Sequence, residues 1–203
     1  MDKFSVIDIK TGFEMLPYTS IQTAAYENIC SEFLHRKEKD KECLFPTFEE
    51  DGHIYKLNGV VIPSVTKILQ LSGIADFSTI PIWHLEPARQ FGLAVHKACE
   101  LYDLGKLDER NLDPALWPYL DAWIAYQKAM DIKEFLAIEH PIVSVNFKVA
   151  GTPDRIAPSD KRRRFGILLQ PEGTFKITEY KDKNDWQVFL AALSIVNWKA
   201  RNK

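Results

Sequence analysis

Two ionisable residues, Asp8 and Lys10, interrupt a largely apolar run at residues 4–10. Side chains at positions i and i+2 of a strand point to the same face, so a strand here would place a carboxylate beside an ammonium group. A carboxylate can ligate a hard divalent cation, and a fixed positive charge can hold a water molecule and offset charge that develops on a phosphate. The pair therefore suits phosphodiester hydrolysis. The plain alternative is that Lys10 is the ion-pair partner of a buried Asp8, because buried charges are rare without a partner or a metal.

Asp154 offers a second carboxylate, in the sequence Gly-Thr-Pro-Asp-Arg at residues 151–155. An aspartate after Thr-Pro also commonly caps a turn, which is its alternative role. Glu139 is expected on a strand beside that of Asp154. A supporting role near a metal and an ordinary charge at a sheet edge are equally open for it.

Two predicted helices carry further candidates, because positions i and i+4 are neighbours on a helix face. Gln22 and Tyr26 share one face and could contact a phosphate or steady Lys10, with polar capping of the sheet as the alternative. His96 is a candidate metal ligand, against the alternative of a histidine packed between helices. Glu100 shares its face, and pairing with a neighbouring Lys or Arg is the favoured role for it.

In this combination the residues resemble the motifs of the PD-(D/E)XK nuclease superfamily, and within it those of RecB-like and Cas4-like exonucleases, including phage-encoded ones. Asp154 matches the first acidic motif. Asp8 and Lys10 match the D/E-x-K motif, and Gln22 with Tyr26 match the QxxxY motif that this subgroup carries on the following helix.

The resemblance covers most of the chain. His96, in Gly-Leu-Ala-Val-His-Lys-Ala at residues 92–98, looks like the subgroup's helix histidine, which helps to bind the metal in relatives. Residues 52–59, followed by Ile-Pro-Ser-Val-Thr at 62–66, look like the N-terminal hairpin and helix start of phage members.

The resemblance implies a single α/β nuclease domain over residues 1–203, with a restriction-endonuclease-like core: a central mixed β-sheet of about five strands flanked by helices. It implies that Asp8, Asp154 and His96 bind Mg²⁺ or Mn²⁺ and that Lys10 positions the attacking water, with Asp8 and Asp154 also part of the catalytic set. The residues expected to contact the phosphate or support the site are Gln22, Tyr26 and Glu139. The implied activity is that of a metal-dependent DNA exonuclease in phage or mobile-element recombination, with DNA as substrate and a single-strand annealing protein as partner.

The order of the motifs departs from that of the family. There the D/E-x-K strand directly follows the strand with the first acidic residue, whereas here Asp8 precedes Asp154 by 146 positions. Moving residues 3–40 between Asp160 and Lys161 would restore the family order, so we expect a rearranged chain whose fold is rebuilt in space. The predicted segments are a displaced D-x-K strand and QxxxY helix at 3–40, a linker at 35–51, a hairpin, helices and the first acidic motif at 53–160, and a C-terminal hairpin and helix at 161–203.

Hydrophobic periodicity and turn residues predict the individual elements. One helix is expected to open near Thr19 or Ser20, and Asn58-Gly59 favours a type I′ turn within a hairpin. The aromatic residues of the helix at 114–130 are expected in the core rather than on a base-stacking platform. The other predicted elements are strands at 4–10, 53–57, 60–62, 137–145, 147–157, 165–169 and 174–180, and helices from Ser64, at 87–104 and at 185–199.

Charge is unevenly distributed along the chain, although the net charge is only −2. Residues 161–203 hold ten Lys/Arg and four Asp/Glu, and residues 1–160 hold sixteen and twenty-four, so the two parts carry about +6 and −8. This asymmetry allows a basic face for phosphates beside an acidic metal pocket. A solvated surface is the simpler explanation of a charge run by itself.

The three cysteines, Cys30, Cys43 and Cys99, are odd in number and lack CxxC spacing, which argues against a disulfide scaffold or a zinc site. Some members of the resembled subgroup hold an iron–sulfur cluster on four cysteines, so three predict no cluster. The first residues contain no apolar run of signal-peptide type, and no stretch approaches the length of a membrane span. A cytoplasmic protein without membrane contact is expected.

Other functions stay open. A rearranged chain could keep the sheet and lose the catalytic geometry, which would leave a catalytically silent nucleic-acid-binding or partner-binding module. A sequence-specific endonuclease is disfavoured by the QxxxY and helix-histidine features. A tether after the N-terminal segment would also allow this segment to be exchanged between protomers, so a single chain and a segment-swapped homo-oligomer are both compatible with the sequence.

Overall fold

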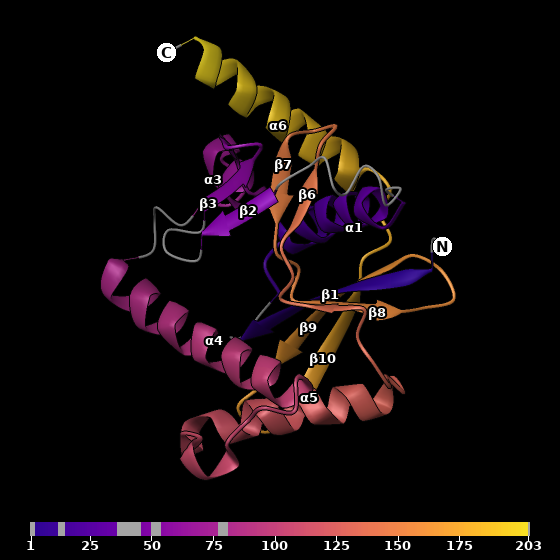
Figure 1. Ribbon diagram of the computed structural model, residues 1–203. Helices are drawn as coiled ribbons and strands as arrows, with labels where there is room; N and C mark the ends of the chain where they lie inside the picture. The colour runs from indigo at the N-terminus through magenta and orange to yellow at the C-terminus, as the bar shows by residue number, and fades with distance from the viewer. Residues whose placement is uncertain (1–2, 12–14, 36–45, 50–53, 77–80, 203) are drawn as a thin grey trace.

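The computed structural model describes residues 3–11, 15–35, 46–49, 54–76 and 81–202. A central β-sheet crosses the molecule, with helices on both of its faces (Figure 1). Its strands lie in the order β10 (Phe175–Glu179), β9 (Arg163–Leu169), β1 (Phe4–Thr11), β8 (Arg155–Pro158) and β5 (Ala137–Ile138). β1 runs antiparallel to β8 and parallel to β9, so the predicted α/β class with a mixed five-stranded sheet is confirmed.

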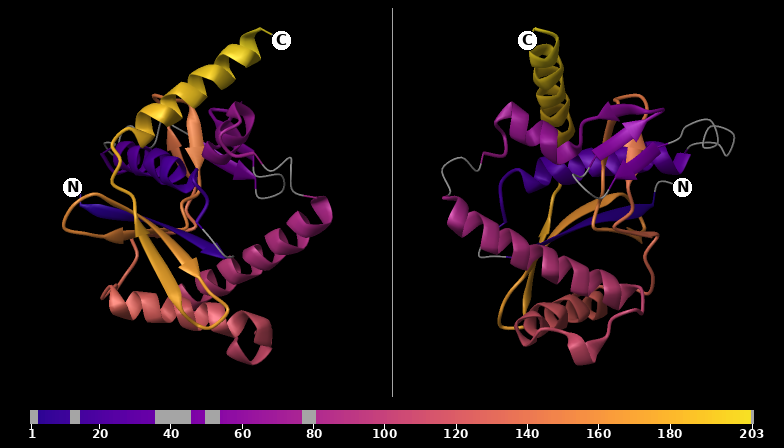
Figure 2. Two further views of the ribbon diagram at one scale, coloured as in Figure 1. Left: turned by 180° about the vertical axis from the view of Figure 1, so that it is seen from behind. Right: turned by 60° about the vertical axis from the view of Figure 1, so that its left-hand side comes forward.

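β1 separates two layers of helices (Figure 2). One layer consists of α1 (Thr19–His35), α3 (Val65–Ser72) and α6 (Asp185–Arg201), and the other of α4 (Ile82–Asp103) and α5 (Trp117–Ala129). Successive side chains of a strand point to opposite faces, so Phe4 and Val6 join the first core while Ile7 and Ile9 join the second. Burial of each of these apolar side chains contributes about 1.5–3 kcal/mol to the free energy of folding. The alternation therefore fixes which face of β1 each residue presents.

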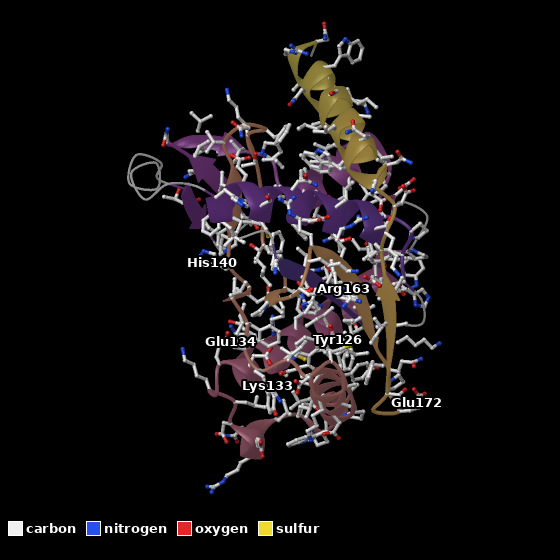
Figure 3. The ribbon with its side chains drawn as sticks, turned by 90° about the vertical axis from the view of Figure 1, so that its right-hand side faces the viewer. Tyr126, Lys133, Glu134, His140, Arg163 and Glu172 are labelled. Atoms are coloured by element: carbon white, nitrogen blue, oxygen red, sulfur yellow. The ribbon has the colours of Figure 1, made fainter. Side chains whose placement is uncertain are left out.

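The aromatic residues of α5 lie in the second core, as predicted. Trp123 and Tyr126 are buried, and their rings stack with centroids 5.3 Å apart. Figure 3 shows Tyr126 between its helix and the sheet, and Glu172 at the tip of the β9–β10 hairpin. The rings of Trp123 and Tyr126 are thus unavailable for stacking on nucleic-acid bases.

Two helices begin at positions other than those predicted. α4 begins at Ile82 and not at Pro87, because Pro81, with φ of −58°, already supplies the fixed backbone angle that suits the start of a helix. Pro87 then lies inside the helix, where it removes one backbone hydrogen bond. α5 begins at Trp117 because the preceding residues form a short 3₁₀ turn. The two 3₁₀ turns before α5 are Glu109–Asn111 and Pro114–Leu116.

A strand lies where a linker is predicted. β2 (Pro46–Glu49) pairs antiparallel with β3 (Ile54–Leu57), and β3 pairs with β4 (Val60–Ile62) in a second sheet. The prediction of a linker over 35–51 is therefore wrong for β2, because this strand is held by pairing with β3 and carries little pattern of its own. The ring centroids of Phe48 and Tyr55 lie 4.8 Å apart across the pair. Of the other residues of the predicted linker, the structure describes only His35, the last residue of α1.

The hairpin turn between β3 and β4 is as predicted. Asn58 and Gly59 have φ of 51° and 79°, the left-handed values that a type I′ turn requires at both central positions.

The two strands predicted over 137–157 are each broken, since β6 (Ile142–Ser144) and β7 (Val149–Gly151) form a separate two-stranded sheet. The break follows Glu139, whose φ of 44° ends the extended backbone of β5.

Candidate functional site

A cleft of about 1210 Å³ lies where β1 ends and β8 begins. Residues of β1, α1, α3, α4 and the β3–β4 hairpin line it. Its lining includes all the site residues predicted from the sequence: Asp8, Lys10, Gln22, Tyr26, His96, Glu139 and Asp154. Residues that are far apart in the sequence are thus brought together within one chain.

Asp8 and Lys10 form an ion pair on one face of β1. Lys10 Nζ lies 2.8 Å from Asp8 Oδ2, the carboxylate is 2% exposed, and the lysine side chain is 24% exposed. Apart from this ion pair, Asp8 Oδ2 is buried and accepts no hydrogen bond from the described residues. A buried acceptor with unused capacity, next to a cleft, is the kind of group that a cation can satisfy.

Asp154 is joined directly to β1. β1 runs antiparallel to β8, with Ile7 opposite Arg155, so the strand of Asp8 lies directly beside the strand that follows Asp154. Asp154 lies just before β8, and its Oδ2 accepts a hydrogen bond from the backbone amide of Ile9 at 2.5 Å. The alternative role of Asp154 as a simple turn cap is therefore not what the structure has.

His96 lies on α4 and faces two carboxylates, those of Asp154 and Glu139. Its Nδ1 lies 3.7 Å from Asp154 Oδ1 and 3.8 Å from Glu139 Oε1, and about a quarter of the side chain is exposed. One potential ligand atom from each of the three residues lies within 4.8 Å of the others. His96 is thus a group at the cleft wall, and not a histidine packed between helices.

Burial and mutual repulsion disturb the acid–base equilibria of this cluster. Burial, reinforced by Asp154 and opposed by Lys10, raises the pKa of Asp8 to about 6. Burial and the neighbouring Glu139 also raise the pKa of Asp154. Burial lowers the pKa of His96, but the two nearby carboxylates outweigh this effect and the net change is upward. For Lys10 the two aspartates likewise outweigh burial and raise the pKa, so its ammonium group stays charged.

The donor set fits a hard divalent cation. Asp154, Glu139 and His96 offer two carboxylates and an imidazole, and Asp8 adds a carboxylate on the neighbouring strand. Mg²⁺ and Mn²⁺ accept such oxygen-rich sets. Of the three predicted ligands, His96 and Asp154 belong to this group together with Glu139, and Asp8 lines the same cleft.

Gln22 and Tyr26 lie on α1 and line the same cleft as the acidic cluster. Gln22 Nε2 donates a hydrogen bond to the Tyr26 hydroxyl at 3.3 Å, and Gln22 Oε1 accepts none from the described residues. Burial raises the pKa of the tyrosine, which therefore stays protonated. A side chain at Gly151 would collide with the Tyr26 ring, so glycine is required at the start of the Gly-Thr-Pro-Asp-Arg sequence.

Glu100 follows its plain prediction. Its carboxylate forms an ion pair with Lys97, with Oε2 2.8 Å from Nζ. The cleft does include both side chains in its lining, so this pair borders the site without joining the acidic cluster.

Two fully buried charges, Arg155 and Asp103, were not predicted from the sequence. Arg155 Nε lies 2.6 Å from Asp103 Oδ2, and Arg155 Nη1 donates to Glu139 Oε1 at 3.1 Å. The alternation of side chains along a strand could have predicted the burial of Arg155, because its side chain must point to the face opposite that of Asp154. A charged residue directed into a helix-covered face needs a buried partner.

The chain matches no protein-family model, and no curated protein is significantly similar to it. Among the described helices, none combines the length and apolar character needed to cross a bilayer.

Proposed function

We propose that this protein is a divalent-metal-dependent deoxyribonuclease that cleaves phosphodiester bonds with the residue set of PD-(D/E)XK exonucleases. One observation carries the proposal: Asp8, Lys10, Asp154 and His96 line a single cleft. Asp154 reaches this cleft although it lies 145 positions after Ile9, whose backbone amide binds its carboxylate. An ion pair that served stability alone would not need a second buried carboxylate and a histidine at the same place.

The side chains divide into two roles. Asp8, Asp154 and His96, with Glu139 beside them, would hold Mg²⁺ or Mn²⁺. The cation, when bound, supplies Lewis-acid polarisation of the phosphate and lowers the pKa of a water molecule. Lys10 keeps its positive charge next to Asp8, where it can orient a water molecule and stabilise negative charge on the phosphate in the transition state.

The order of strands in the sheet supports a rearranged restriction-endonuclease-like core. β8 ends at Pro158 and β9 begins at Arg163, yet β1 lies between them and pairs with both. Placing residues 3–40 between Asp160 and Lys161 would make β8, β1 and β9 consecutive in sequence as they are in space. β1, α1 and β9 would then form a parallel crossover of the usual kind.

DNA as the substrate, an exonucleolytic mode, a role in phage or mobile-element recombination and a single-strand annealing partner follow from the motif resemblance. Cleavage of end-labelled linear DNA in Mg²⁺ or Mn²⁺, with EDTA as the blank, tests the activity. Nucleotides should be released by the wild type and not by Asp154→Asn. A matched control is Asp131→Asn, since Asp131 is exposed, pairs with Lys133 at 2.5 Å and has a φ of 52° that asparagine also adopts.

Three outcomes separate the functions. Metal-dependent release of nucleotides supports the exonuclease. DNA that is retained without cleavage would instead indicate a catalytically silent binding module. Cleavage of closed circular DNA would indicate an endonuclease.

A further inference from the structure

A buried ion pair lies directly behind the candidate metal ligands. Arg155 Nε and Asp103 Oδ2 are 2.6 Å apart, and neither side chain has any exposed surface. Asp103 is the last residue of α4, the helix that also carries His96. The pair therefore joins the strand that follows Asp154 to the helix of a second ligand.

The surroundings hold this pair in one position. Asp103 accepts hydrogen bonds from Trp123 Nε1 at 3.0 Å and from Gln127 Nε2 at 2.8 Å, both on α5. The guanidinium group lies over the rings of Trp123 and Phe135, 5.6 and 5.8 Å from their centroids. α4 and α5 pack against each other beneath the sheet (Figure 1), so this position is set by the second core.

The opposite side of Arg155 faces the cleft residues. Its Nη1 donates to the backbone oxygen of Asp154 at 2.6 Å and to Glu139 Oε1 at 3.1 Å. The same Asp154 oxygen accepts the backbone amide of Glu139 at 3.0 Å. Glu139 has φ of 44°, a conformation that a residue with a side chain rarely adopts unless its surroundings impose it. One guanidinium group thus contacts the carboxylate of Glu139 directly and, through the Asp154 oxygen, is linked to its backbone amide.

We propose that Arg155, backed by Asp103, is a positioning residue that presets Glu139 and Asp154 to receive the divalent cation. This inference rests on the proposed metal site and adds Glu139 to it as a held ligand. Asp103 has a second role, since its charge cancels that of Arg155. Without it, a buried positive charge would stand one hydrogen bond from Glu139 and would repel a cation there.

A different result is expected if the Arg155–Asp103 ion pair only stabilises the core and has no part in metal binding. Loss of either partner would then lower thermal stability and leave the affinity for metal unchanged. Outer groups that orient metal ligands typically change affinity by tenfold to a hundredfold when they are removed. Metal affinity, measured on folded protein, therefore separates the two roles.

The experiment compares Mn²⁺ dissociation constants, measured by titration with electron paramagnetic resonance and without DNA. Asp103→Asn retains the shape of the side chain and removes its charge. The matched control is Asp185→Asn, because Asp185, on α6 in the other layer of helices, forms a largely buried pair with Arg164 at 2.9 Å. Both variants should melt at lower temperature. Asp103→Asn should raise the Mn²⁺ dissociation constant by about tenfold or more, and Asp185→Asn should leave it within about twofold.

An unchanged dissociation constant in Asp103→Asn would overturn the proposal. Should that variant fail to fold, Gln127→Met removes a single hydrogen bond to Asp103 at similar volume. About threefold weaker Mn²⁺ binding would support the proposal, and wild-type binding would overturn it. A wild type that binds Mn²⁺ without cleaving DNA removes the nuclease function and leaves the comparison intact. A wild type that binds no Mn²⁺ overturns both proposals.

Discussion

The backbone amide of Ile9 donates a hydrogen bond to Oδ2 of Asp154 at 2.5 Å. Asp154 is thereby fixed by the strand that carries Asp8 and Lys10, so the geometry of the site is a property of the register between β1 and β8. A shift of one residue would turn Asp8 to the opposite face, where the second core lies. The sheet therefore positions all three side chains together, whatever the order in which the chain supplies its strands.

Replacing Lys10 by alanine should leave Mn²⁺ binding largely intact and lower the rate of DNA cleavage by about a hundredfold or more. The physical reason is that one preorganised charge at a transition state contributes about 3 kcal/mol. Single-turnover cleavage at saturating Mn²⁺ measures the effect. Lys133→Ala is the control, because Lys133 is 78% exposed and pairs with Asp131. Cleavage by Lys10→Ala within a few-fold of wild type would exclude the proposed role.

Replacing Asp8 by asparagine should abolish cleavage and raise the stability of the metal-free protein near neutral pH. The pKa of Asp8 is about 6 in the folded state, against an ordinary value of 3.8, so the folded protein binds this proton more tightly. Stability from this group is fully present below about pH 4 and is lost as the pH rises through about 6. At pH 8 the charged carboxylate thus destabilises the fold by at most roughly 3 kcal/mol, a cost that asparagine avoids.

The measurement is urea unfolding of wild type and Asp8→Asn in EDTA at pH 4 and pH 8. The gain from the substitution should be large at pH 8 and small at pH 4, because Asp8 in the folded protein is already protonated and uncharged at pH 4. Equal effects at the two pH values would contradict a raised Asp8 pKa. Unfolding of the variant would assign Asp8 to a structural ion pair and favour a binding module.

Mn²⁺ affinity should rise with pH between about 6 and 8. Asp8 loses its proton near pH 6, and His96, whose pKa is raised, must also be deprotonated before its nitrogen can act as a ligand. Binding should therefore release protons, which calorimetry detects as a heat that depends on the ionisation enthalpy of the buffer. A pH-independent affinity with no proton release would remove both residues from the metal site.

Local patterns in the sequence predicted much of this arrangement. The two-residue spacing of Asp8 and Lys10 was sufficient to place both on one face of a strand, and Asn58-Gly59 was sufficient to identify a hairpin turn, because both depend on neighbouring residues alone. The start of α1 at Thr19 is similarly local.

Features that depend on distant partners were not predicted. β2 is held by pairing with β3, and Glu139, which has a left-handed backbone, is hydrogen-bonded to Asp154 and Arg155. The buried partner of Arg155 is Asp103, 52 positions away, and nothing in the helical pattern around Asp103 distinguishes it from an exposed acid. The sequence therefore identified the residues that face the cleft better than those that hold them.

Replacing Gly151 by alanine should destabilise the fold by about 1–3 kcal/mol, because a Cβ atom there would collide with the Tyr26 ring in a packed region. Gly151 ends β7 three residues before Asp154, so relief of the collision must move either the ring or the strand that leads to the site. Urea unfolding of Gly151→Ala, Tyr26→Ala and the double variant measures the coupling. The alanine at 151 should be nearly neutral once the ring is absent. An equal loss in both backgrounds would show that the glycine is needed for its backbone and not for the contact with Tyr26.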